Sequence, residues 1–255
     1  SKLDEETATW LDWGEDKLTA RKTELRETLI AESETGKITM VEWNNAWSKL
    51  TRSMDIYRTI KDIEISGNHA EYHSANVTDT EAIGHAVNGR SITGIVHGAG
   101  LEESKLVADK SWSTFDLIVR VKVDGWKALT AAAGESLRFA CSFTSVAGRF
   151  GNGGQTDYAA ANSILDAEMA RLTAAGDCRA VAIGWTGWRD VGMATRGSIE
   201  AVFEAAGIET LSVDEGVEIF VGEALAGGKR RVIGCGSLGL MDRFDSFREA
   251  PLRLP

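Results

Sequence analysis

The feature that most constrains the fold lies near the middle of the chain, where a strand-like run, a glycine-rich loop and a helix-forming run follow one another. Residues 139–143 form a short apolar run with the length and flanks of a buried strand. Ser145 stands where that strand should end, and an alanine-rich run begins near Tyr158. Tyr158 and Asn162 are four residues apart, so a helix places them on one face. A serine at a strand end and a tyrosine on the next helix can converge on one small polar group, at the edge where open α/β sheets bind ligands.

Strand-like and helix-like segments alternate on both sides of this stretch, which predicts an α/β fold. Residues 92–97 are a typical buried parallel strand, and Gly98-Ala99-Gly100 follows, where small residues let a ligand approach the backbone. The predicted strands are 70–79 with its exit, 92–97, 139–143, 179–183 and 230–234, and the predicted helices are 80–88, 114–133 and the one that begins near Tyr158.

Composition excludes several classes of partner. The length of 255 residues fits one α/β domain, or one domain with an appendage. A net charge of −10 argues against nucleic acid or an anionic membrane surface. No apolar run approaches the roughly 20 residues of a membrane helix, and the amino terminus does not resemble a signal peptide. The 3 cysteines and 4 histidines show no metal-ligand spacing, so we expect no metal site. Because the number of cysteines is odd, we also expect reduced thiols and a cytoplasmic protein.

The first 66 residues differ in kind from the rest. They are charged, nearly free of glycine and rich in helix formers, and Trp43 and Trp47 stand four apart. Two interpretations are open: an amphipathic insertion that packs on its own domain, or a segment that docks a neighbouring domain or partner. A helical stripe is predicted from Leu18, Leu25 and Leu29. The predicted organisation is a helical segment at 1–66, an α/β domain at 67–245 and a tail at 246–255.

A resemblance to a known family rests on four residues and the words around them. Ser145, Tyr158 and Asn162 are spaced as in the catalytic stretch of the short-chain dehydrogenase/reductase superfamily. The words TSVAGRFGNGGQTDYAAAN and KVDG, which begins at Lys122, resemble the ketoreductase domains of polyketide synthases and of related polyunsaturated fatty-acid and enediyne synthases. On its own, Lys122 on the apolar side of a helix would be interpreted as snorkelling or salt-bridged. The resemblance, from about residue 70 to 240, implies a Rossmann-like, doubly wound parallel sheet and catalytic roles for all four residues.

The same resemblance implies NADPH as the cofactor. Family members carry an aspartate near the cofactor's adenine where this chain has Asn76, which can still accept and donate hydrogen bonds. Alternatively, Asn76 starts a turn before the next helix. The matching family segment at Gly98–Gly100 lies against ribose and phosphates, and a plain tight turn is the alternative there. The implied cofactor-binding residues are Asn76, Val77, Gly98, Ala99, Gly100, Lys122, Tyr158 and Gly187, and the implied substrate and lid residues are Phe150, Gln155, Trp188 and Met193.

Two glycine-rich motifs must be compared with the family pattern: one that the family has near its start, and one that this chain has at residues 234–239. The family begins with a strand and a TGGxxGxG-like loop that holds the pyrophosphate at a helix N-terminus. No such segment precedes residue 70, so we expect a sheet without its first βαβ unit, as in a fragment of a longer polypeptide. The GxGxxG at residues 234–239 is followed by too little chain for a helix and the acidic residue beyond it. We interpret that motif as the exit of the last strand.

The resemblance implies a function and leaves alternatives open. It implies NADPH-dependent reduction of a β-ketoacyl thioester on an acyl carrier protein, with that carrier and neighbouring synthase domains as partners. One alternative is a non-catalytic structural domain of a megasynthase, which the absent glycine loop favours. Another is a free-standing carbonyl reductase. Product stereochemistry cannot be assigned, because Glu102-Glu103-Ser104 and Phe150 stand where the family signatures would be.

Overall fold

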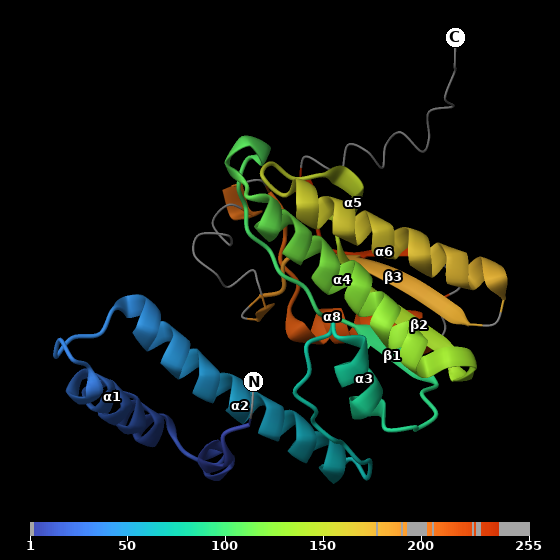
Figure 1. Cartoon of the computed structure of the whole chain (residues 1–255). Coiled ribbons are helices and arrows are strands. Elements are labelled where there is room, and N and C mark those ends of the chain that lie inside the picture. Colours follow the sequence, from blue (N-terminus) through green and yellow to red (C-terminus); the bar gives the residue numbers. More distant parts are fainter. Residues whose placement is uncertain are drawn as a thin grey trace. The chain divides into compact units, whose positions relative to one another are not determined.

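The computed structural model divides the chain into two compact units, Ser1–Ala75 and Asn76–Pro255 (Figure 1). We call the first the helical unit and the second the sheet unit. Among the described residues, no helix is long and apolar enough to cross a membrane. The structure describes residues 3–176, 178–189, 191–192, 203–205, 207–225, 227 and 231–239.

The helical unit consists of the 3-10 helix η1 (Glu5–Trp10) and the α-helices α1 (Glu15–Glu32) and α2 (Met40–Ile65). A capping box starts α2: the hydroxyl of Thr39 accepts from the N–H of Glu42, and the Glu42 carboxylate accepts from the N–H of Thr39. This local arrangement satisfies two backbone donors that the first turn of a helix leaves without partners.

Tryptophan supplies the small core of the helical unit. Trp10 is almost completely buried and its ring stacks on that of Trp13, with 5.4 Å between centroids. Arg21 of α1 lies over the ring of Trp10 at 5.3 Å, so the helix is held partly by a cation–π contact. No described residue of α1 is fully buried. The predicted stripe is a partly buried face that consists of Leu18, Leu25 and Leu29.

The sheet unit is built on four parallel strands whose order in the sheet is their order in the chain. The register places Ser142 beside both His97 and Ala182. The two central strands are almost continuously buried, as expected for a parallel sheet with layers on both faces. The strands are β1 (Gly94–His97), β2 (Phe139–Ser145), β3 (Arg179–Trp185) and β4 (Arg231–Gly234).

Helices cover both faces of this sheet (Figure 1), which confirms the predicted doubly wound α/β class. On one face, Trp126 and Leu165 pack against Ile95 and Ala140. Because neighbouring residues of a strand point to opposite faces, Cys141 belongs to the core under α8 on the other face. The helices are α3 (Thr80–Val87), η2 (Val107–Asp109), α4 (Trp112–Ala133), η3 (Gly134–Ser136), α5 (Ala147–Phe150), α6 (Thr156–Ala175) and α8 (Val213–Leu225).

Most predicted elements are confirmed, with ends that shift by a few residues. The strand predicted at residues 70–79 is wrong: residues 67–79 contain no strand. The physical reason is that a strand needs a hydrogen-bonded neighbour, and none of the four described strands pairs with this segment. The interpretation of GxGxxG as a strand exit is confirmed within the described residues, since β4 ends at Gly234 and no α-helix follows up to residue 239.

Candidate active site

Ser145 is the last residue of β2, at the carboxyl-terminal edge of the sheet. The N–H of Val146 donates to the carbonyl oxygen of Trp185 on β3 at 3.1 Å, and the chain then turns directly into α5. The hydroxyl oxygen of Ser145 accepts from the N–H of Ala147 at 3.2 Å. The hydroxyl proton is therefore left to donate to another group.

Tyr158 lies in the first turn of α6 and is 9% exposed. Burial raises the pKa of its phenol, hydrogen bonds with the side chains of Ser145 and Asn162 lower that pKa, and the charge of Glu102 raises it. The net shift is upward, so the phenol carries its proton at neutral pH. The fold thus brings together the serine and the tyrosine that the sequence motif predicts.

Asn162 lies one helical turn after Tyr158 and is completely buried. Its amide nitrogen donates to the carbonyl oxygen of Tyr158 at 2.7 Å. Its amide oxygen is buried and has no hydrogen-bond partner among the described residues. A Cβ at Gly148 would lie 2.8 Å from the Cβ of Asn162, so only glycine lets α5 pack this closely on α6.

Lys122 of α4 extends to the same strand end and is 3% exposed. Its ammonium nitrogen donates to the carbonyl oxygen of Phe143 at 3.0 Å and lies 5.8 Å from the centroid of the Tyr158 ring. Burial lowers the pKa of Lys122 to about 8, although the negative charge of Asp166 raises it. The ammonium is mostly cationic at pH 7, and it lies beside the ring of Tyr158.

The segment after β1 passes directly over Lys122. A Cβ at Gly100 would lie 3.1 Å from Cε of Lys122, so the backbone at Gly98-Ala99-Gly100 and the lysine share one wall of the site. His97, at the end of β1, donates from Nε2 to the carbonyl oxygen of Lys122 at 2.9 Å. Burial lowers the pKa of His97 to about 4, so this buried histidine is neutral and supports the helix that carries Lys122.

Asn76 and Val77 make local and packing contacts in the structure. The side-chain oxygen of Asn76 accepts from the N–H and the hydroxyl of Thr78, at 3.2 and 3.0 Å. This is the turn before α3, which Asp79 caps by accepting from the N–H of Ala82. Val77 packs on Gly125, where a Cβ would lie 2.9 Å from its methyl group, and this contact explains the glycine of the KVDG motif.

The predicted substrate and lid residues are spread over several places. Gln155 donates from Nε2 to the carboxylate of Glu102 at 3.0 Å, next to Tyr158. Phe150 ends α5, and Arg149 lies over its ring at 5.7 Å. The ring of Trp188 packs on that of Trp185, with 5.0 Å between centroids. The carbonyl oxygen of Gly187 accepts from the N–H of Leu211, and Met193 lies outside the described residues.

A buried carboxylate, Asp166, belongs to this region and was not predicted. It lies on α6, accepts from the hydroxyl of Thr144 at 2.9 Å and pairs with Arg231 of β4 at 3.1 Å. Burial raises the pKa of Asp166, while the Thr144 hydrogen bond and the positive charges of Arg231, Arg149 and Lys122 lower it. An acidic residue two turns after Tyr158 in an alanine-rich helix was the available signal.

Comparison with known sequences places the chain among synthase domains. A family model described as "KR domain" matches residues 30–190. Polyketide synthase PksM of Bacillus subtilis is 29% identical over 171 residues, 64% of this chain and 4% of PksM. A 6-methylsalicylic acid synthase of Arthrobotrys oligospora is 38% identical over 127 residues, 49% of this chain and 7% of that protein. The chain therefore spans only a small part of these relatives.

Comparison with solved structures agrees with the sequences. A ketoreductase domain from the bacillaene assembly line matches with a TM-score of 0.63 and 26% identity, over 82% of this chain and 50% of that one. A short-chain dehydrogenase from Burkholderia cenocepacia, in complex with NADP, matches in fold alone, with a TM-score of 0.62 and 18% identity over 73% of this chain and 83% of that one. Since the family model covers most of the chain and the relatives agree, the chain belongs to the KR family, the ketoreductase domains of polyketide synthases.

Proposed function

We propose that this domain reduces the β-ketone of an acyl thioester on an acyl carrier protein to the β-hydroxyl, with NADPH as the reductant. The observation that carries the proposal is the convergence of three side chains at one strand end. The phenol of Tyr158 is buried against Ser145, and the Lys122 ammonium lies 5.8 Å from the tyrosine ring. These are an acid, a hydrogen-bond donor and a cation, which is the set that reduction of a carbonyl group requires.

Each side chain has a distinct task in the proposed reaction. NADPH, when bound, supplies the hydride that reaches the carbonyl carbon. Tyr158 donates its phenolic proton to the carbonyl oxygen, where negative charge develops. Ser145 donates a hydrogen bond to that same oxygen and stabilises the charge. The ammonium of Lys122 favours the phenolate that proton donation leaves behind. Asn162 fixes the helix backbone at Tyr158 through its 2.7 Å hydrogen bond.

The residues of this site fit the nicotinamide end of such a cofactor. Lys122 makes one hydrogen bond with a described residue, so two of its three ammonium protons are available for ribose hydroxyls. The segment Gly98-Ala99-Gly100 has small side chains, so its backbone is accessible beside the place where the ribose would lie. The groups named here would contact the nicotinamide and ribose of the cofactor.

The relatives support the assignment of cofactor and partners. The Burkholderia cenocepacia relative was solved with NADP, and the bacillaene relative is a ketoreductase of an assembly line. The curated relatives are polyketide synthases many times longer than this chain. By that similarity, we assign NADPH as the cofactor, and an acyl carrier protein and adjacent synthase domains as partners.

The test is a fluorescence titration of this chain with NADPH, followed by turnover of an acetoacetyl thioester. We expect saturable binding and NADPH oxidation in the wild type. Tyr158→Phe should abolish turnover and keep NADPH binding, because the phenol donates the proton and the ring still fills its place. Turnover in Tyr158→Phe equal to the wild type would contradict the mechanism. Binding without any turnover would favour a non-catalytic structural domain. If NADPH does not bind, the strand and glycine-rich loop that hold the pyrophosphate in the family must be added before turnover is tested.

A further inference from the structure

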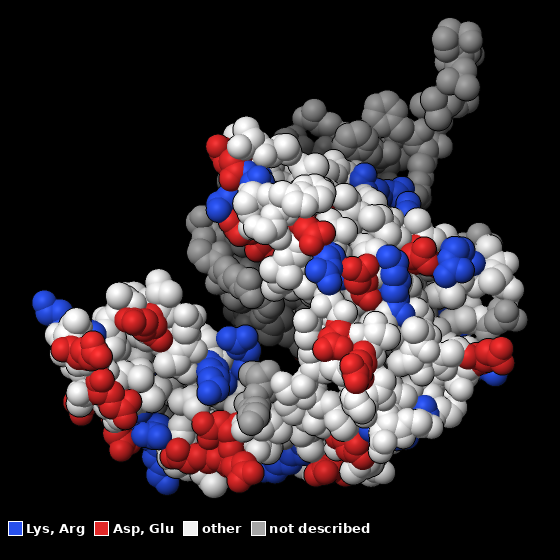
Figure 2. Space-filling view, in the orientation of Figure 1, with Lys and Arg blue, Asp and Glu red and all other residues white. Residues whose placement is uncertain are grey.

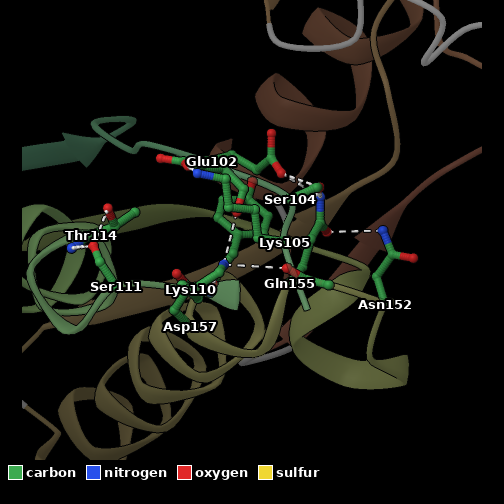
Figure 3. Close-up of polar contacts among 12 residues, drawn as sticks. Glu102, Ser104, Lys105, Lys110, Ser111, Thr114, Asn152, Gln155 and Asp157 are labelled. Atoms are coloured by element: carbon green, nitrogen blue, oxygen red, sulfur yellow. Dashed lines mark hydrogen bonds and ion pairs between the residues drawn. The ribbon is translucent and has the colours of Figure 1, made fainter. Parts of the chain in front are cut away.

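A buried ion pair lies next to the proposed acid, and the catalytic mechanism does not use it. Lys110, just before α4, pairs with Asp157 of α6 at 2.6 Å, and the two side chains are 2% and 0% exposed. The ammonium of Lys110 also donates to the carbonyl oxygens of Glu103, at 2.8 Å, and Gly154, at 3.2 Å. All three ammonium protons therefore have an acceptor (Figure 3).

These contacts join two segments that are far apart in the sequence. The segment at 102–110 follows β1, and the segment at 152–157 leads into α6; Lys110 and Asp157 are separated by 47 positions. The N–H of Lys105 donates to the carbonyl oxygen of Gly154 at 3.0 Å. Gly154 has a φ of +78°, and a Cβ there would lie 3.3 Å from the Lys105 nitrogen, so glycine is needed at this crossing. Gln155 adds hydrogen bonds to Glu102 and Ser104 (Figure 3).

The ion pair acts on the residue that follows it in the chain. The same Asp157 oxygen that binds Lys110 accepts from the backbone N–H of Tyr158 at 2.8 Å. Gln155, the residue just before α6, makes no side-chain hydrogen bond that caps the helix. The Asp157 carboxylate is therefore the side-chain acceptor for one first-turn donor, the N–H of Tyr158, which a helix leaves without a backbone partner. Lys110 holds that carboxylate in place, and the carboxylate holds the backbone of Tyr158.

We propose that Lys110 and Asp157 form a clasp that positions Tyr158 for proton donation. The proposal deepens the proposed function and rests on it. A buried ion pair contributes little net stability over apolar side chains of similar size, because removing both charges from water is costly. Its place beside Tyr158 gives it a different task, which is to fix where the first turn of α6 begins. Lys110 and Asp157 are positioning residues, since they act on the reaction through Tyr158.

The experiment compares two variants with a matched control. Lys110→Met leaves the Asp157 charge buried and unpaired, and it should lower the melting temperature as well as turnover. The double variant Lys110→Met/Asp157→Asn removes a cation and an anion together and keeps an acceptor oxygen. Lys105→Met is the control, because that side chain is 52% exposed and on the same segment. We expect the double variant to melt near the wild type, with kcat lowered roughly 10- to 100-fold and KM for NADPH unchanged within about twofold.

A spectroscopic readout separates positioning from a purely structural role, and it does not need turnover. The chain has 3 tyrosines, so 3-fluorotyrosine labelling of a Tyr57→Phe/Tyr72→Phe background leaves one fluorine signal, at Tyr158. Burial raises the pKa of Tyr158, so loosening the first turn should move its titration to lower pH in the double variant. The charged groups that act on this phenol, Glu102 and Lys122, stay in every variant. The control should titrate as the wild type does.

The outcomes distinguish this proposal from the proposed function. A wild type that fails to reduce the thioester contradicts the proposed function, and the fluorine titration still decides the clasp. Unchanged titration and unchanged kcat in the double variant overturn the clasp. A double variant in which kcat recovers together with the melting temperature also overturns the clasp, because the role of the ion pair would then be purely structural.

Discussion

Charged side chains are exposed in the helical unit, whereas several are buried at the candidate-site edge of the sheet. In the helical unit, ion pairs such as Arg58–Asp55 and Lys61–Asp12 lie at the surface, with side chains 48–87% exposed. Figure 2 shows acidic and basic side chains interspersed over the visible surface of that unit. At the sheet edge, Lys122 and the Lys110–Asp157 pair are almost completely buried. Burying a charge is costly, so these buried charges are weak evidence for stability and agree with the proposed role of this edge in chemistry.

The largest expected effect is on the free energy of unfolding, when a buried apolar side chain is removed from the core. Trp126 of α4 is 2% exposed in the core under the sheet, and Trp112 of the same helix is 75% exposed. Trp126→Ala should lower the free energy of unfolding by about 3–5 kcal/mol, because it leaves a cavity. Trp112→Ala should change it by less than about 1 kcal/mol. Urea unfolding followed by tryptophan fluorescence measures both, and equal losses would contradict the assignment of this core.

The next effect should fall on turnover and spare stability. Lys122→Met removes the cation beside Tyr158, and it should lower kcat about 100-fold, or about 2.7 kcal/mol of transition-state free energy. The melting temperature should stay the same or rise, because methionine carries no buried charge. Lys127→Met, on the exposed side of the same helix, is the control. A large loss of stability with unchanged kcat would make Lys122 a structural residue and break the comparison between the two regions.

A smaller effect should appear as a pH shift. Asp166 raises the pKa of Lys122, which burial lowers to about 8. Asp166→Asn removes that support, so the pKa of Lys122 should fall. Lys122 is cationic only below its pKa, and the alkaline limb of the kcat profile should therefore move to lower pH. Kinetics across the pH range measure the shift, and Asp124→Asn at the exposed side of α4 should leave the profile in place. A shift to higher pH would contradict the role given to Asp166.

The smallest effect belongs to the surface of the helical unit. Arg58→Ala removes an exposed ion pair with Asp55, three residues before it on α2. Such pairs contribute little because water and salt screen them, so the free energy of unfolding should change by less than about 0.5 kcal/mol. Chemical denaturation at low and high salt tests this. A salt-dependent loss above about 1.5 kcal/mol would show that surface charge also carries stability here.

The sequence predicted elements well where one local pattern decides them. The apolar run at residues 139–143 and the apolar side of α4 each indicate an element without reference to the rest of the chain. The strand predicted at residues 70–79 failed, because a strand depends on a neighbour that a local pattern does not contain.

The residues of the candidate site were also predicted only in part. Ser145, Tyr158 and Lys122 were identified through the family resemblance, and the structure brings their side chains together. Lys110 and Asp157 were missed, because their pairing depends on how the segment after β1 crosses Gly154. No spacing rule connects two charges between which α4, η3, β2 and α5 all lie. Contacts of this kind become visible only with tertiary structure.

The strand order has a consequence for how the domain is made. Because β1, β2, β3 and β4 are neighbours in the same order as they occur in the chain, each new strand can add to the free edge of the one before it. Among the four described strands, none must wait for a later one to be inserted between it and its neighbour. During synthesis, which proceeds from the amino terminus, this sheet can therefore grow at one edge, one strand and one covering helix at a time.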